Sequence, residues 1–242
     1  MKRFLFLSVL LVIILSSCDQ MFGKRIHGNG RIKTETRTAH GFNSIDVSGS
    51  IDVIIRQDSV RSIKIETDEN LLEYVQVIDE GEKLVIHTER GFNLNTTKGI
   101  KVYISSPVFR YLEASGACNY FSENMIVSSE KISFDLSGSC DVKVELDAPA
   151  VEADLSGACS VQLKGKTKDL QVEGSGSSDF KCMELLAENV EIDISGSGYA
   201  EVYASVKLDV SVSGSGDIKY KGNATVSQHV SGAGSVKKVD AP

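Results

Sequence analysis

One short motif, Ser-Gly followed by a small residue, returns along the second half of the chain and constrains the fold more than any other feature. Its serines are Ser115, Ser137, Ser156, Ser175, Ser195, Ser213 and Ser231, which are spaced by 22, 19, 19, 20, 18 and 18 residues. A period near 20 residues is typical of architectures in which each repeated unit packs only on its neighbours. The repeat therefore predicts an elongated array of stacked units.

Apolar and polar residues alternate before each motif serine, as in the segments that contain Phe134 and Leu136 or Ile192 and Ile194. This period of two is typical of β-strands, and Ser-Gly suits the tight corner that follows. A second alternating piece, such as residues 141–146, comes after each corner. We predict an all-β, right-handed parallel β-helix (β-solenoid) with coils of about 18–22 residues. An antiparallel sandwich is the alternative, but it does not explain why one tripeptide returns at one phase.

The first seventeen residues read as an export signal. A basic Met1–Arg3 precedes an apolar run to Leu15, which is too short to span a bilayer as a helix. Leu15-Ser-Ser-Cys18 resembles a bacterial lipobox, in which the cysteine carries the lipid and anchors the protein to a membrane. We expect an exported protein in the cell envelope, anchored through Cys18. Asp19 resembles an inner-membrane retention signal, but that rule holds in some bacterial lineages only and leaves the choice of membrane open. The outer membrane is the expected location, with the periplasmic or surface side open.

The charge of the chain limits its partners. The sequence has 26 basic and 33 acidic residues, and removal of residues 1–17 takes away Lys2 and Arg3, which leaves 24 basic residues and a net charge of −9. This acidity argues against nucleic acid or an anionic lipid surface as the main partner. We expect no nucleic acid, no nucleotide, and a polysaccharide or protein at the cell surface.

The mature chain divides into a tether and one domain. We predict a lipid-anchored tether over residues 18–37 and a single β-solenoid domain over residues 38–242, with a less regular first half (38–108) and regular repeats (109–237). Ser48-Gly49-Ser50 is an early copy of the corner. The first half is therefore expected to form the opening coils of the same solenoid, with longer insertions, a turn near residues 69–73 and a hairpin loop at 79–83.

Several segments carry a resemblance to a known family. Residues 42–55, 68–72 and 83–86, followed by the Ser-Gly series, resemble the putative auto-transporter adhesin head GIN domain, formerly a domain of unknown function common in lipoproteins of the Bacteroidetes. The resemblance covers about residues 38–225. It implies a right-handed β-helix-like fold and an exported location, and it brings no functional residues onto this sequence.

Stacked coils place equivalent residues in columns about 4.8 Å apart. The column two residues before each motif serine reads Glu113, Asp135, Asp154, Glu173 and Asp193, and continues as Ser211 and His229. Like charges at this spacing repel one another, so the column is either a solvated acidic stripe, which we favour, or a calcium or catalytic site. The calcium-binding motif of repeat toxins has a spacer before its aspartate that is absent at Gly214-Ser-Gly-Asp217.

Two further columns follow each corner. Six residues after the serines stand Phe121, Lys143, Gln162, Lys181, Glu201, Lys219 and Lys237. The lysines of this column either protect exposed strands from aggregation or meet an acidic polysaccharide. Three residues after the serines stand Cys118, Cys140 and Cys159, with Cys182 out of phase. Neighbouring cysteines could form a disulfide or remain as a stack of buried free thiols, and both alternatives stay open.

Catalytic motifs are not apparent. The four histidines at positions 27, 40, 87 and 229 stand apart, there is no G-x-S-x-G, and the Ser-Gly-Ser-Gly runs precede strands instead of the helix that a nucleotide site needs. We expect no catalytic residues, no enzymatic activity, and no cofactor apart from the calcium alternative. The predicted function is a lipid-anchored adhesin or ligand-binding module. A polysaccharide lyase-like β-helix enzyme and a calcium-dependent structural envelope protein are the alternatives.

Overall fold

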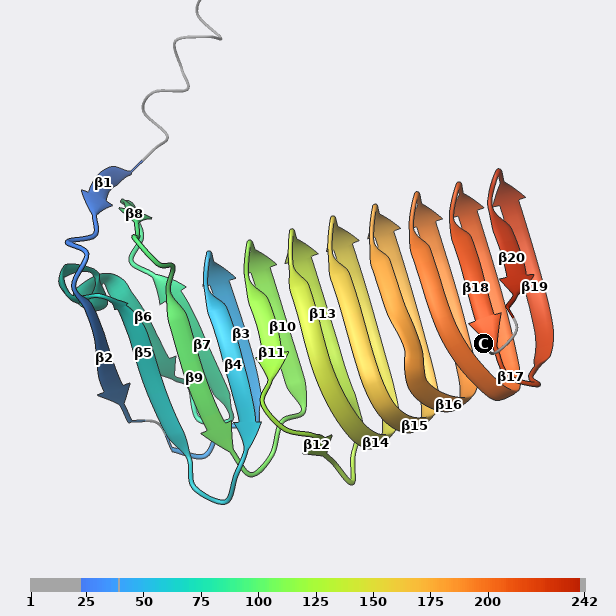
Figure 1. The fold of residues 1–242 in the computed structure, drawn as a ribbon, viewed down its shortest axis with the longest axis horizontal. Helices are drawn as coiled ribbons and strands as arrows, with labels where there is room; N and C mark the ends of the chain where they lie inside the picture. Colours follow the sequence, from blue (N-terminus) through green and yellow to red (C-terminus); the bar gives the residue numbers. More distant parts are fainter. Residues whose placement is uncertain (1–22, 39, 240–242) are drawn as a thin grey trace, which may run out of the picture.

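The computed structural model describes residues 23–38 and 40–239, so the predicted signal peptide and Cys18 lie outside the described residues. Its strands stack into one long β-solenoid (Figure 1). In chain order they are β1 (Lys24–His27), β2 (Ile32–Arg37), β3 (Ser44–Gly49), β4 (Asp52–Gln57), β5 (Ser62–Asp68), β6 (Val75–Asp79), β7 (Lys83–Thr88), β8 (Phe92–Asn95), β9 (Lys101–Ser106), β10 (Tyr111–Gly116), β11 (Asn119–Ser122), β12 (Ile126–Val127), β13 (Ile132–Gly138), β14 (Asp141–Gly157), β15 (Ser160–Gly176), β16 (Asp179–Gly196), β17 (Tyr199–Gly214), β18 (Asp217–Lys221), β19 (Thr225–Gly232) and β20 (Ser235–Lys238). No helix among these residues is long and apolar enough to cross a membrane.

The regular coils pair in parallel and in register. Each motif serine lies opposite the serine of the next coil, from Ser115 and Ser137 to Ser213 and Ser231. The early copy joins the same ladder, because Ser48 of β3 pairs with Ser115 of β10. The predicted parallel β-solenoid is confirmed, and the antiparallel sandwich is wrong for these coils.

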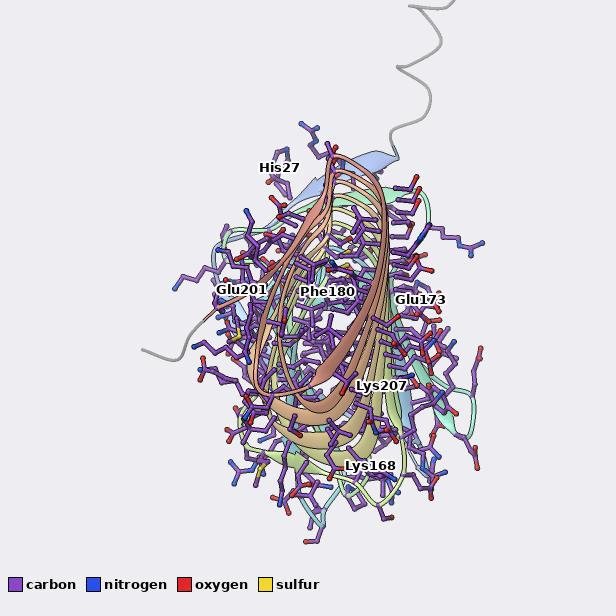
Figure 2. The ribbon with its side chains drawn as sticks, turned by 90° about the vertical axis from the view of Figure 1, so that its right-hand side faces the viewer. His27, Lys168, Glu173, Phe180, Glu201 and Lys207 are labelled. Carbon is purple, nitrogen blue, oxygen red and sulfur yellow. The ribbon has the colours of Figure 1, made fainter. Side chains whose placement is uncertain are left out.

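Each regular coil has two flat faces, one Ser-Gly corner and one opposite bend, as the view along the stack shows (Figure 2). From β14 to β17 one strand of 16 to 18 residues runs from corner to corner across that bend. Coils of unequal length are accommodated by shifts of register on the face after the corner and at the bend, for example between Gln162 and Lys164. The corners themselves therefore remain aligned along the whole array.

The core lies between the two faces and consists of the inward residues of the alternating pattern. Phe134, Phe180 and Tyr120 are at most 1% exposed, and Figure 2 places Phe180 inside the coil. Full burial of a side chain of this size contributes about 1.5–3 kcal/mol. The regular spacing of such residues is what allows each coil to bury the face that it cannot bury alone.

The first half differs in order from the prediction. The turn and the hairpin loop appear where they were expected, the turn as a 3₁₀ helix, η1, at Glu69–Tyr74, and most of this half forms the strands β3 to β9. However, β3 pairs with β7 on one edge and β10 on the other, and β4 lies between β9 and β11. The chain therefore leaves the stack after β4, forms the end of the solenoid, and returns past β3 and β4 at β10 (Figure 1).

This end of the molecule is closed by antiparallel pairs. β5 pairs antiparallel with both β2 and β9, and β6 pairs antiparallel with β7. The predicted tether over residues 18–37 is therefore wrong for its second part, because β1 pairs with β8 and β2 pairs with β5. The weak alternation of Ile32–Arg37 gave no clear sign of a strand.

A buried carboxylate fixes the start of the described chain onto this end. Asp68 is 0% exposed. It accepts hydrogen bonds from the backbone N–H of Gly30 at 2.7 Å, the backbone N–H of Thr97 at 2.8 Å and the hydroxyl of Thr97 at 2.8 Å. Burial raises the pKa of Asp68, but the hydrogen bonds from Thr97 and Gly30 together outweigh burial and hold the pKa below its ordinary value. Asp68 thus joins three separate segments of the closed end.

Candidate functional site

The acidic column predicted from the sequence exists and is longer than predicted. Glu113, Asp135, Asp154, Glu173 and Asp193 lie directly opposite one another on successive coils. Asp46 of β3 adds a sixth carboxylate, because it pairs with Glu113. The column ends as Ser211 and His229, as expected.

More carboxylates flank this column on the same side of the solenoid. The outward positions two and four residues before the acidic column form two neighbouring rows. The nearer row contains Glu152, Glu191 and Asp209, and the farther row contains Asp169. Three lysines accompany them, Lys83, Lys131 and Lys207. We call this surface the acidic face. Figure 2 shows Glu173 and Lys207 on one side of the coil and Glu201 on the other.

Lysines compensate part of the repulsion at the β3–β10 end of the acidic column. The ammonium of Lys83 lies 3.0 Å from Oδ2 of Asp46 and 2.7 Å from Oε2 of Glu113. The hydrogen bond to Glu113 and the charge of Asp46 raise the pKa of Lys83, against the effect of burial. Lys131 contacts Glu152 in the next row. Asp135, Asp154, Glu173 and Asp193 belong to no such ion pair among the described residues.

The effect of this repulsion is clearest at Asp154. Burial, and the carboxylates of Glu152, Glu173 and Asp135, raise the pKa of Asp154. The folded state therefore disfavours the ionised form of this side chain. The packing of the coils stabilises the acidic face, and the repulsion among its outward carboxylates destabilises it.

We expect Asp154→Asn to stabilise the protein at pH 7 by up to about 1 kcal/mol, because it removes a like charge between two others. The gain should disappear as the pH falls through the raised pKa of Asp154, since the wild-type side chain then becomes neutral as well. Urea unfolding of the wild type and the variant, at pH 7 and in acid where Asp154 is protonated, measures the effect. Asp193→Asn is the matched control with a smaller gain, because Ser211 replaces one of its neighbours. An Asp154→Asn variant that is less stable than the wild type at pH 7 would contradict this reading.

The acidic face is nearly flat. A shallow hollow of about 400 Å³ lies over Asp135, Asp154, Glu173 and Asp193, and Ser156 and Ser175 line it as well. In residues 23–38 and 40–239, no three or more His, Cys, Asp or Glu side chains are arranged to hold a metal ion. The calcium alternative therefore stays a prediction without a preformed set of ligands.

The opposite side, which we call the mixed face, carries the predicted lysine column in register, from Phe121 and Lys143 to Lys219 and Lys237. Carboxylates stand among these lysines. Asp141, Asp179 and Asp217 occupy the row two residues earlier, and Lys219 lies 3.9 Å from Glu201 and above the ring of Tyr199. Opposite charges thus alternate here, and the two faces differ in electrostatic character.

The cysteine column is internal. Cys118, Cys140, Cys159 and the out-of-phase Cys182 are all buried free thiols. Burial raises the pKa of Cys118 to about 11 and that of Cys182 to about 12, so both are neutral at physiological pH. The hydrogen bond between Cys159 and Cys140 raises the pKa of Cys159. The four side chains are free thiols in this structure, and a disulfide between neighbours of the column stays a prediction.

Sequence reasoning placed only five carboxylates of the acidic face, and Asp46 and Lys83 are two of the members that it missed. Asp46 stands at the same phase before Ser48 as Glu113 does before Ser115, and this signal could have placed it in the column. Lys83 carries no comparable signal, because it reaches the column from β7, which pairs with β3 across 39 residues of sequence. The histidines lie apart, with His40 close to Asp79 at 3.1 Å.

Comparison with known proteins finds a family that matches most of the chain. A family model described as putative auto-transporter adhesin, head GIN domain, matches residues 41–224. No curated protein sequence matches the chain.

Several solved structures share this fold. A putative adhesin from Bacteroides fragilis has a TM-score of 0.84 and 22% identity, with 88% of this chain and 100% of that chain covered. A putative adhesin from Parabacteroides merdae has a TM-score of 0.68 and 25% identity, covering 90% and 100%. A putative lipid binding protein from Parabacteroides distasonis has a TM-score of 0.70 and 23% identity, again covering 90% and 100%.

Proposed function

Because the chain belongs to the putative auto-transporter adhesin, head GIN domain family, we propose that it is a non-enzymatic adhesion module of the cell envelope. Its anchor is the lipid on Cys18, as the lipobox-like Leu15-Ser-Ser-Cys18 indicates. Its binding surface is the acidic face, and its ligand is a positively charged protein or polysaccharide surface. The outer membrane is the expected location.

The observation that carries this proposal is the continuity of the acidic face. Six carboxylates follow one another on adjacent coils from Asp46 to Asp193, and further carboxylates flank them. A flat, charged strand surface of this kind suits an extended partner, whereas small-molecule sites are concave and mostly apolar. Potentials of opposite sign across such an interface set specificity and association rate.

The proposal is tested with the fragment 19–242, which keeps every described strand. The acidic-face variant is Asp135→Asn, Asp154→Asn and Asp193→Asn together. The mixed-face variant, Asp141→Asn, Asp179→Asn and Asp217→Asn, changes the net charge by the same amount on the other side. Capture on an array of envelope glycans and host-surface proteins is measured against an unrelated solenoid.

We expect the wild-type fragment to bind basic members of the array and to lose that binding as the salt concentration rises, since the Debye length falls to about 3 Å at 1 M. The acidic-face variant should lose the binding and the mixed-face variant should keep it. Equal capture of both variants, or no capture above the unrelated solenoid, counts against this surface as the binding site.

A further inference from the structure

The two ends of the solenoid differ. The end formed by β2, β5 and β6 is closed by antiparallel pairs. At the other end, β19 pairs with β17 and β20 with β18, and within residues 23–38 and 40–239 neither strand has a partner on its outer edge. The backbone hydrogen bonds between successive Ser-Gly corners also end here. The N–H of Ala233 donates to the carbonyl of Gly214 at 2.9 Å, and the carbonyl of Gly232 occupies the next acceptor position in this series.

The interior of the stack is open at this end. In the preceding coil Val210 and Val212 are 4% and 1% exposed. Their equivalents in the last coil are Gln228, which is exposed, and Val230, which is half-buried. Val226 and Val236 are half-buried as well. Each earlier coil covers this apolar surface with the next coil, so the last coil presents the same kind of surface that holds the array together.

β19 also lacks the usual protection of an edge strand. Exposed edges in natural proteins commonly carry charges or proline that prevent pairing with another chain. Residues 225–232 contain no Asp, Glu, Lys, Arg or Pro. The acidic column has ended by this point, because its positions are Ser211 and His229. A second acidic molecule could therefore approach β19 without facing a row of carboxylates.

We propose that this open end is a self-association surface, at which β19 pairs antiparallel with β19 of a second copy around a two-fold axis. Such an interface is self-complementary, because both molecules contribute the same surface. It would give the outer N–H and C=O groups of β19 partners and cover the open core. The other end of each copy is closed, so association stops at a dimer. β1 and β19 lie at opposite ends of the molecule (Figure 1), so the proposed dimer would be one long rod with β1 of each copy at an outer end.

Sedimentation equilibrium of the fragment 19–242 tests the proposal. The dimer-breaking variant is Ser227→Lys with His229→Lys, since both side chains are exposed on β19 and their like charges would face each other in an antiparallel pair. Ser133→Lys with Gln171→Lys is the matched control, because it adds the same charges to the same side of inner coils. Circular dichroism confirms that each variant is folded.

The wild-type fragment is expected to dimerise, and the control variant to dimerise with the same dissociation constant. The Ser227→Lys, His229→Lys variant should raise that constant at least ~10-fold, because like charges directly opposite in a ladder are unfavourable. A wild-type fragment that stays monomeric up to about 1 mM, where association is worth only about 4.1 kcal/mol, overturns the proposal. A dimer that the β19 lysines leave unchanged also overturns it.

Discussion

Gly176→Ala is expected to lower the free energy of unfolding by about 2–5 kcal/mol. Gly176 has φ of +92° and stands in the corner column, where each glycine packs on the glycine of the coil before it. A Cβ at Gly176 would lie 2.6 Å from the carbonyl oxygen of Gly157, which is backbone and cannot move aside. Two separate costs are therefore combined at one position.

Gly81→Ala separates these two costs. Gly81 has a φ of +83° in the β6–β7 hairpin, with no atom within 4 Å of an added Cβ. Only the strain of the positive φ applies there, about 1–2 kcal/mol. Guanidinium unfolding of both variants measures the difference. If the two substitutions cost the same, the close approach of neighbouring corners is not what requires glycine.

Asp68→Asn is expected to destabilise the protein by about 2–3 kcal/mol at pH 7. The carboxylate accepts hydrogen bonds from two backbone N–H groups, whereas the amide of asparagine would turn its own N–H donor toward one of them. The backbone N–H of Thr97 is the group left without an acceptor, since it bonds Oδ2 of Asp68 while Gly30 bonds Oδ1. The affected contacts lie at the closed end. The acidic face should therefore keep its structure in this variant.

The effect of Asp68 should depend on pH in a definite direction. Its pKa is lowered in the folded protein from the ordinary value of 3.8. The stability that it contributes is therefore fully present above pH 3.8 and is lost as the pH falls below that value, through the lowered pKa. Urea unfolding should show the gap between wild type and Asp68→Asn closing in acid. Asp141→Asn, at an exposed position on the mixed face, should show almost no gap. A gap that is constant with pH would mean that the charge of Asp68 is not involved.

The repeats could be predicted because their signal is local. Alternation indicates a strand, and Ser-Gly at one phase aligns the corners, so the register from Ser115 to Ser231 follows from spacing alone. The place of β3 between β7 and β10, and of β4 between β9 and β11, could not be predicted in this way. Residues 58–99 leave the stack and form its end, and no spacing in the sequence records which earlier strand a returning strand will meet.

The candidate site also has residues that could be predicted from the repeat and residues that could not. Five members of the acidic column were evident from the repeat, whereas Lys83 reaches Asp46 and Glu113 only through the pairing of β7 with β3. Asp68 was visible in the sequence only as one residue of a family-like segment. Its three donors come from Gly30 and Thr97, 38 and 29 residues away, and contacts of that range depend on the closed fold.

The most direct test of the account uses the full lipidated chain in neutral phosphatidylcholine vesicles. Vesicles that carry the wild-type protein should be retained on a poly-lysine surface and not on a dextran sulfate surface. The acidic-face variant should lose this retention and the mixed-face variant should keep it. Cys18→Ser should leave the vesicles without protein. Equal retention of the two face variants, or wild-type retention on dextran sulfate, would contradict an adhesion module that is anchored at Cys18 and binds through its acidic face.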